Sequence, residues 1–208
     1  DECYLTDVRT AVAGAVAAKY LSPSNVKTIG IVGTGVQARL QLRYLKDIVN
    51  CRNVIVWGRN QKALLRYEKE MSMYEYQITT TTNISDIVEH CQLIVTCTPS
   101  ERSLINAVRP GTHITAIGSD TVSKRELSSD VMLQADMIVT DSKDQSRIRG
   151  EIYQVLKDGN SLDGITELGQ IISGKIEGRV SQEHITIADL TGVAVQDIQI
   201  SKAVLKNL

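Results

Sequence analysis

A glycine-rich segment carries the most recognisable chemistry in this sequence. It follows the pattern G-x-G-x-x-A and reads Gly33-Thr34-Gly35-Val36-Gln37-Ala38. A β-branched run at 28–32 precedes it and an amphipathic pattern at 36–48 follows it, which predicts a strand, a turn and a helix. In that setting the glycines allow a tight turn and let backbone N–H groups approach a pyrophosphate. We therefore expect all six residues to form a dinucleotide-binding loop; the alternative is a glycine turn that serves packing alone.

The residues after the second predicted strand bear on which dinucleotide fits. A site for NAD usually places a carboxylate there, where it accepts hydrogen bonds from the ribose 2′-OH. This chain has no acid at that point and reads Trp57-Gly58-Arg59-Asn60. Because a guanidinium pairs well with a 2′-phosphate, we expect NAD(P) with a preference for NADP(H), held in part by Arg59 and Asn60. The alternative is that Arg59 is a solvated charge and both cofactors bind.

The elements that must position these residues alternate along the chain. Strands are expected at 28–32, 53–57, 76–80, 92–96, 112–117, 137–140 and 184–189. Helices are expected at 8–20, 36–48, 60–71, 84–89, 146–156, 168–173 and 193–204. This alternation predicts an α/β fold with a Rossmann-type, doubly wound parallel sheet, because crossover helices must cover both of its faces. We expect a linking helix at 1–24, a dinucleotide-binding domain at 25–189 and a C-terminal helical segment at 190–208.

Composition and charge exclude several classes of protein. The chain has 208 residues, of which 42% are hydrophobic and 23% charged, as in an ordinary globular domain. Its 23 basic and 24 acidic residues give a net charge of −1, which does not fit a nucleic-acid-binding protein. No apolar run approaches the ~20 residues that span a bilayer, and the first residues do not resemble a signal peptide. We expect a soluble, cytoplasmic protein with a small-molecule substrate and no nucleic-acid or membrane partner.

The cysteines and histidines predict no metal site. The cysteines have no C-x-x-C spacing and no histidine at ligand spacing, so we interpret them as thiols of a reducing compartment; they are Cys3, Cys51, Cys91 and Cys97. The histidines are scattered through a helix end and two strands, and we interpret all three as structural; they are His90, His113 and His184.

Six motifs, including the glycine loop, occur in a fixed order along the chain. The other five are Leu5-Thr6-Asp7-Val8-Arg9-Thr10-Ala11, Thr96-Cys97-Thr98-Pro99-Ser100, Pro110-Gly111-Thr112-His113-Ile114, Gly118-Ser119-Asp120 and Asp189-Leu190-Thr191-Gly192-Val193-Ala194-Val195-Gln196-Asp197. Together they resemble the conserved blocks of the ornithine cyclodeaminase and mu-crystallin family over essentially the whole chain. The resemblance is to the C-terminal two thirds of a member. It implies that the family's N-terminal substrate and dimerisation domain is largely absent and that the full-length form is a homodimer.

The resemblance also implies an activity. Members of this family carry out redox chemistry at an amino acid α-carbon, namely ornithine cyclodeamination, alanine dehydrogenation and ketimine reduction, and mu-crystallin also binds ligands. By resemblance, Arg9 matches the arginine that holds the substrate carboxylate, and Asp120 matches the catalytic aspartate that handles the substrate nitrogen and its proton. Without the family, Arg9 is a surface charge near a helix N-terminus, and Asp120 is an N-cap for a helix at 121–126.

Further cofactor contacts are implied at the ends of later strands: Thr98, Pro99, Gly118, Asp189 and Gly192. A structural or cofactor-proximal role is implied for Asp141, Gln145, Gly150 and Glu151. The family often carries Phe and a Ser or Lys near the late turn, whereas this chain reads Ala188-Asp189-Leu190. This departure leaves the choice of substrate open.

Three functional hypotheses follow. The leading one is an NAD(P)-dependent oxidoreductase or cyclodeaminase that acts at the α-carbon of an amino acid or cyclic ketimine. The second is a cofactor-binding fragment or crystallin-like binding protein without activity of its own. The third, a protein of another family with the same fold, would require the later motif matches to be coincidental.

Overall fold

The computed structural model describes residues 3–206, which fold around one parallel sheet. Across the sheet the strands lie in the order β3-β2-β1-β4-β5-β8-β6-β7. Their bounds are β1 Ile29–Val32, β2 Asn53–Trp57, β3 Gln77–Thr81, β4 Leu93–Thr96, β5 His113–Ala116, β6 Met137–Thr140, β7 Thr166–Glu167 and β8 Thr186–Asp189. The parallel strand order confirms the predicted α/β, Rossmann-type fold.

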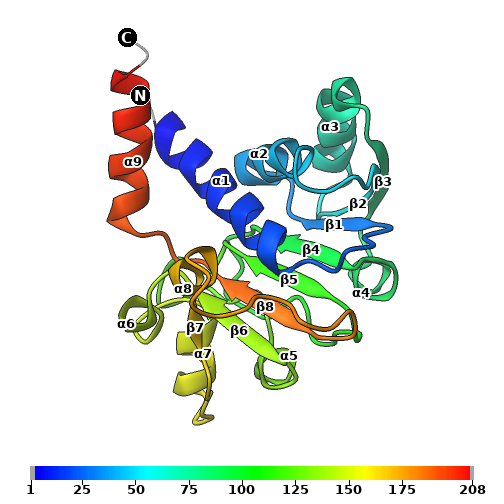
Figure 1. Ribbon diagram of the computed structural model, residues 1–208. Helices are drawn as coiled ribbons and strands as arrows, with labels where there is room; N and C mark the ends of the chain where they lie inside the picture. Colours follow the sequence, from blue (N-terminus) through cyan, green and yellow to red (C-terminus); the bar gives the residue numbers. More distant parts are fainter. Residues whose placement is uncertain (1–2, 207–208) are drawn as a thin grey trace.

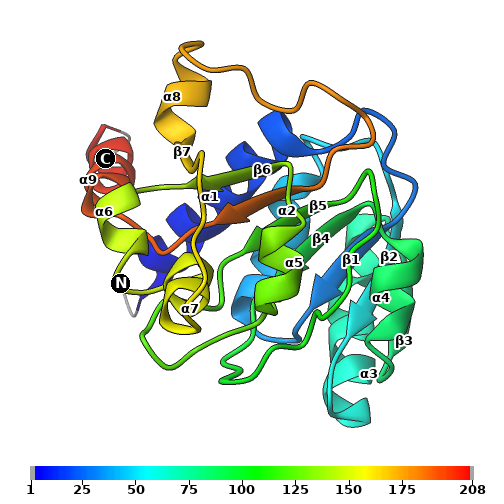
Figure 2. The ribbon, with the colours of Figure 1, turned by 90° about the horizontal axis from the view of Figure 1, so that it is seen from below.

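Helices cover both faces of the sheet (Figures 1 and 2). They are α1 Tyr4–Leu21, α2 Val36–Leu45, α3 Gln61–Met71, the 3₁₀ turn η1 Ser72–Tyr74, α4 Ser85–His90, α5 Ser129–Leu133, α6 Lys143–Ser146, α7 Glu151–Lys157, α8 Leu168–Ile172 and α9 Ala194–Leu205. Side chains of α1, α2, α3 and α8 share a buried apolar cluster with Ile29 and Ile31 of β1. A second cluster joins α4, α5 and α7 to Val32. No helix within residues 3–206 is long and apolar enough to cross a membrane.

The last strand is inserted into the sheet instead of being added at its edge. β8 pairs with β5 on one side and with β6 on the other. Across β1, β4, β5 and β8 the residues in register are Val32, Thr96, Ala116 and Asp189. The loops that follow these four strands therefore leave the sheet next to one another at its carboxyl edge, where open α/β sheets bind ligands.

Local breaks explain where the observed elements differ from the expected ones. The helix expected at 146–156 begins only at Glu151, as α7, because Gly150 directly before it has φ +96°; α6 ends at Ser146, where the expected helix starts. α1 begins at Tyr4, one turn before the expected start, and α2 ends at Leu45 instead of 48. β7 and α5 have two and five residues, which is too short for a periodic sequence pattern to indicate them.

A buried histidine lies where β5 and β8 begin, at the opposite edge of the sheet. His113 is fully buried, with its Nδ1 atom 2.9 Å from Oγ1 of Thr186 and its Nε2 atom 3.0 Å from Oγ1 of Thr115. Arg179 donates to the same Thr186 hydroxyl at 3.0 Å. Burial, reinforced by the charge of Arg179, lowers the pKa of His113 from 6.5 to about 3. The ring is therefore neutral in the folded protein.

We expect acid to destabilise the protein through His113. Below pH 6.5 the unfolded chain binds a proton at this residue, whereas the folded protein does so only near pH 3. The contribution of His113 to the free energy of unfolding should therefore fall by about 1.4 kcal/mol for each pH unit below 6.5. Urea unfolding of the wild type and His113→Gln at several pH values measures this contribution, because subtracting the two curves removes the other titrating groups.

The difference between wild type and His113→Gln should narrow as the pH falls. As a control, His90→Gln alters an exposed histidine at the end of α4 and should follow the wild type throughout. A difference between wild type and His113→Gln that stays constant over the whole pH range would contradict this account.

Candidate functional site

The glycine-rich segment forms the expected strand, turn and helix. Gly33 has φ +129°, and a Cβ at this position would lie 3.0 Å from the carbonyl oxygen of Cys97, so glycine is required. Ala38 is fully buried against the sheet. α2 begins at Val36 with no side chain capping its N-terminus. The first N–H groups of this helix are therefore available to an anion.

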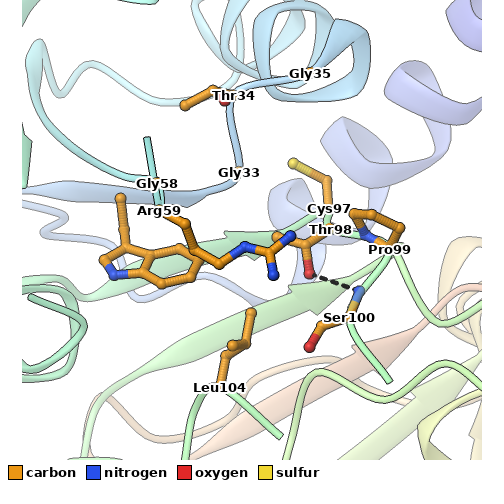
Figure 3. A pocket seen from close by; sticks show the side chains of 11 residues that line it. Gly33, Thr34, Gly35, Gly58, Arg59, Cys97, Thr98, Pro99, Ser100 and Leu104 are labelled. Carbon is orange, nitrogen blue, oxygen red and sulfur yellow. Dashed lines mark hydrogen bonds between the residues drawn. The ribbon is translucent and has the colours of Figure 1, made fainter. Parts of the chain in front are cut away.

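Gly35 is a glycine that the fold itself does not need. Its backbone is extended, with φ −84° and ψ −167°, and a Cβ would meet no atom within 4 Å. The missing side chain leaves room in a hollow between the loops after β1, β2 and β4 (Figure 3). Because a pyrophosphate must come close to the backbone of such a loop, the residues present fit a dinucleotide.

An arginine that was not singled out as a site residue braces this loop. Nη1 of Arg39 donates to the carbonyl oxygens of Thr34 at 2.5 Å and Gly35 at 2.9 Å, while its Nε atom pairs with Glu70 at 2.6 Å. The guanidinium also lies over the ring of Tyr67, 5.0 Å from its centre. Arg39 follows Gly35 by four residues, so helical spacing alone could have placed it beside the loop.

Three of the predicted cofactor residues outside the glycine loop line this hollow. Arg59 extends into it from the end of β2, and Thr98 and Pro99 border it from the loop after β4 (Figure 3). Within residues 3–206 the Arg59 side chain has no hydrogen bond or ion pair, and it is exposed. Its guanidinium is therefore available to a ligand.

Other predicted cofactor residues have side chains engaged elsewhere. The Asn60 side chain caps α3 by accepting a hydrogen bond from the Ala63 N–H at 3.2 Å. The Gln37 amide donates to the backbone and carboxylate oxygens of Asp7 in α1, each at 3.0 Å. Val36 is 58% exposed. These positions can offer a cofactor backbone groups more readily than side chains.

The two residues to which the resemblance gives catalytic roles line a second hollow together. The lining residues are Thr6, Asp7, Arg9, Thr10, Gln37, Ile117, Asp120, Leu190, Thr191 and Gly192. They come from α1, α2 and the loops after β5 and β8. The sheet therefore brings Arg9 and Asp120 to the same carboxyl edge as the glycine loop.

Arg9 is largely buried and already makes contacts with α9. Its Nε atom pairs with Oδ1 of Asp197 and its Nη1 atom donates to Oε1 of Gln196, both at 3.0 Å. The side chain is 16% exposed, which does not fit the alternative of a plain surface charge. A Cβ on Gly192 would lie 2.6 Å from Nη1, so this glycine allows the guanidinium to lie across the late turn.

Asp120 is exposed in a short turn after β5. Its carboxylate forms an ion pair with Lys124 at 2.6 Å, and the Ser119 hydroxyl donates to the Lys124 carbonyl at 2.7 Å. The sequence left open that Asp120 caps a helix at 121–126. No helix occurs at 121–126, so the capping alternative is wrong. The contacts of Asp120 and Ser119 with Lys124 close this segment as a turn instead.

A buried glutamate that was not predicted joins two loops of the site. Glu126 is fully buried, and its Oε1 atom accepts hydrogen bonds from the N–H and the hydroxyl of Thr98, at 2.6 and 2.8 Å. Its Oε2 atom accepts from the Gly118 N–H at 2.9 Å. A Cβ on Gly118 would lie 2.3 Å from Oε2, so this glycine makes room for the carboxylate. A single sequence carries no local signal for such a contact.

Two further carboxylates hold the turn after β8. Asp189 is 1% exposed and accepts a hydrogen bond from the Ile152 N–H at 2.9 Å. Its carboxylate therefore lies at the N-terminus of α7 and does not line either hollow. Asp141 accepts from the Gly192 N–H at 2.6 Å, and Gln145 donates to the Thr191 hydroxyl at 2.6 Å. In the part of the chain that is described, no three His, Cys, Asp or Glu side chains are placed so that they could hold a metal ion together.

Comparison with known proteins gives the family. Residues 1–208 match the model of the ornithine cyclodeaminase/mu-crystallin family. The chain is 41% identical to an uncharacterized cyclodeaminase of Sinorhizobium fredii over 97% of its own length, and 34% identical to the alanine dehydrogenase of Archaeoglobus fulgidus over 100%. The chain therefore belongs to this family. It spans 62% and 65% of the lengths of these two relatives.

Solved structures agree with this family and with the fold. An archaeal alanine dehydrogenase dimer with bound NAD has a TM-score of 0.91 at 34% identity, over 99% of this chain and 66% of that one. A Δ1-pyrroline-2-carboxylate reductase of Thermococcus litoralis, in complex with NADH and L-proline, has a TM-score of 0.91 at 30% identity, over 96% and 63%. Both solved structures hold a nicotinamide dinucleotide.

Proposed function

We propose that this protein is an NAD(P)-dependent oxidoreductase or cyclodeaminase that acts at the α-carbon of an amino acid or a cyclic ketimine. One observation carries the proposal: the hollow beside the glycine loop and the hollow lined by Arg9 and Asp120 lie at the same edge of the sheet. The relatives include an alanine dehydrogenase, ornithine cyclodeaminases and an iminosuccinate reductase. Their range supports the reaction class and leaves the individual substrate open.

The cofactor in this proposal is held mainly by backbone groups. The N–H groups from Thr34 to Gln37 bind the pyrophosphate, with room provided by Gly35. Thr98, Pro99, Gly118 and Gly192 border the path toward the nicotinamide, which supplies hydride transfer when bound. The related structures hold NAD+ and NADH, so a preference for NADP(H) rests on the free guanidinium of Arg59 and the missing acid after β2.

The substrate groups in this proposal are a carboxylate and an amine or imine. Arg9 holds the carboxylate through Nη2, which makes no hydrogen bond among residues 3–206, and through the remaining hydrogen of Nη1. This contact fixes the orientation of the α-carbon. Asp120 accepts or returns the proton of the substrate nitrogen, and its exposed position suits exchange of that proton with solvent.

A second candidate is a cofactor-binding protein without turnover. The contacts of Arg9 with Asp197 and Gln196 favour it, because a substrate carboxylate would have to share the guanidinium with two side chains already bound.

For the whole protein we propose a homodimer, as in the archaeal alanine dehydrogenase. We also propose a cytoplasmic location, on the basis of the buried thiols of Cys51 and Cys91.

Replacing Gly35 separates cofactor binding from folding. Gly35→Ala should weaken NADPH binding about tenfold or more, because the methyl group keeps phosphate from the loop N–H groups, and each charged hydrogen bond contributes about 1.5–3 kcal/mol. The midpoint of thermal unfolding should stay unchanged, since a Cβ meets no atom there. Binding is measured by energy transfer from Trp57. As a control, Gly169→Ala adds a methyl group in α8 that also meets no atom within 4 Å, and it should bind NADPH like the wild type. Equal NADPH affinity of Gly35→Ala and the wild type would refute the loop assignment.

Replacing Arg59 tests the preference between the two dinucleotides. Arg59→Gln should weaken NADPH binding roughly tenfold or more and leave NADH binding unchanged, because NADPH alone carries the 2′-phosphate. The same fluorescence titration compares both cofactors. Arg66→Gln alters an arginine on α3 that pairs with Glu70 at 3.9 Å, and it should change neither affinity. A similar loss for NADH and NADPH would show that Arg59 does not read the phosphate.

Turnover distinguishes the enzyme from the binding protein. The protein should oxidise NADPH when offered a cyclic ketimine, or reduce NADP+ when offered an amino acid, whereas release of ammonia without net NADP(H) change would indicate cyclodeamination. Asp120→Asn should lower kcat at least ~100-fold, the usual range for a lost acid or base, with unchanged NADPH affinity. Tight cofactor binding without turnover of any of these substrates would favour the binding protein.

A further inference from the structure

Three buried carboxylates form a connected series beneath the carboxyl edge of the sheet. They are Glu126, Glu151 and Asp189, with exposed fractions of 0%, 0% and 1%. Oε1 and Oε2 of Glu151 accept hydrogen bonds from the N–H groups of Glu126 and Leu127, at 2.7 and 3.2 Å. Glu151 opens α7, and the next N–H in that helix donates to Asp189. The series therefore runs from the Thr98 loop to the end of β8.

Among the residues that the structure describes, no cationic side chain pairs with this series. None of the three carboxylates takes part in an ion pair within the described part of the chain. The titratable groups whose pKa values the charge of Glu126 raises are themselves acidic: the Cys97 thiol after β4, Glu151 on α7 and Asp189 on β8. Buried charges without a cationic partner are costly. Such groups take up protons more readily than exposed ones.

Protonation of Glu126 would change the number of hydrogen bonds that its carboxyl group can accept. As a carboxylate it accepts three hydrogen bonds, two from Thr98 and one from Gly118. After protonation, the oxygen that carries the proton is a poor acceptor, and the backbone N–H that faces it, of Thr98 or Gly118, cannot accept the new O–H in return. The hydroxyl of Thr98 can accept it, so the bond that is lost is one from a backbone N–H. Since Thr98 borders the cofactor hollow, the loss of one bond alters the wall of that hollow.

We propose that Glu126 is a positioning residue whose carboxylate fixes the Thr98 loop and the Gly118 turn relative to each other, and whose protonation releases them. Its effect on a cofactor rests on the proposed function. Burial raises the pKa of Glu126 to about 7, and hydrogen bonds to the carboxylate, chiefly from Thr98, oppose this rise. We call the hydrogen bonds of Glu126 with Thr98 and Gly118 the clamp. The clamp is complete above neutral pH, where Glu126 is charged, and it loses a bond as the pH falls through the pKa of Glu126.

The amide signals of Thr98 and Gly118 in ¹H–¹⁵N NMR spectra test the clamp without any cofactor. In the wild type both signals should move with pH through one shared step near pH 7. In Glu126→Gln, which cannot ionise, the shared step should vanish. Glu89→Gln, at an exposed glutamate of α4, should retain it. Absence of a shared step in the wild type, or its persistence in Glu126→Gln, would overturn the proposal.

Substitutions at Thr98 give an independent test if Glu126→Gln fails to fold. Thr98→Val removes the hydroxyl donor that favours the charged form of Glu126, so the Gly118 amide step should move to higher pH. Thr98→Ser restores the hydroxyl and should return the step to its wild-type position. A purely structural role for Glu126 predicts no shift of the Gly118 amide step. Equal pH midpoints of this step in the wild type, Thr98→Val and Thr98→Ser would overturn the proposal.

Calorimetry with NAD+ connects the clamp to the cofactor. NAD+ is suitable because it lacks the 2′-phosphate of NADPH, which titrates in the same range. Affinity should fall roughly tenfold as the pH drops through the amide step, in keeping with the loss of one charged hydrogen bond, and should be weak and independent of pH in Glu126→Gln. Constant wild-type affinity across the step would overturn the positioning role. Failure of NAD+ and NADPH to bind at any pH would refute the proposed function, while the amide titration still decides the clamp.

Discussion

Backbone N–H groups that become buried where parallel strands end must each find an acceptor, and in this protein side-chain carboxylates supply several of them. Glu126 satisfies Thr98 and Gly118, Asp141 satisfies Gly192, and Asp189 satisfies the first turn of α7. An unsatisfied buried N–H costs about 1–3 kcal/mol. The loops that border both hollows therefore depend on these carboxylates for their shape.

The carboxylates also explain which glycines the chain requires. A Cβ on Gly118 would overlap Glu126, and a Cβ on Gly150 would lie 2.7 Å from Asp189. Gly192 leaves space for the guanidinium of Arg9 in the same way. In these places glycine makes room for a charged group of the protein itself. Gly35 differs, because a Cβ at this position would meet no atom of the protein and Gly35 itself lines the hollow beside the loop.

The sequence predicted those features that depend on residues close together in the chain. The alternation of elements and the strand, turn and helix around Gly33 follow from local periodicity, and the structure confirms them. The insertion of β8 between β5 and β6 was not predictable, because a strand's neighbours are set by distant residues. The contacts of Glu126, whose partner Thr98 lies 28 residues away, left no local pattern for the same reason. Asp189 was expected to contact the cofactor, yet its burial makes it a support for α7.

Arg9 links the site to the last helix. α9 has no buried side chain of its own along its 12 residues, and an isolated helix of that length is only marginally stable in water. Its polar anchors to α1 are the bonds from Arg9 to Gln196 and Asp197. Any anion that binds Arg9 must share this guanidinium with α9, and the linkage between ligand and helix is reciprocal. If Arg9 holds a substrate carboxylate as proposed, ligand binding and the position of α9 are coupled through this one side chain.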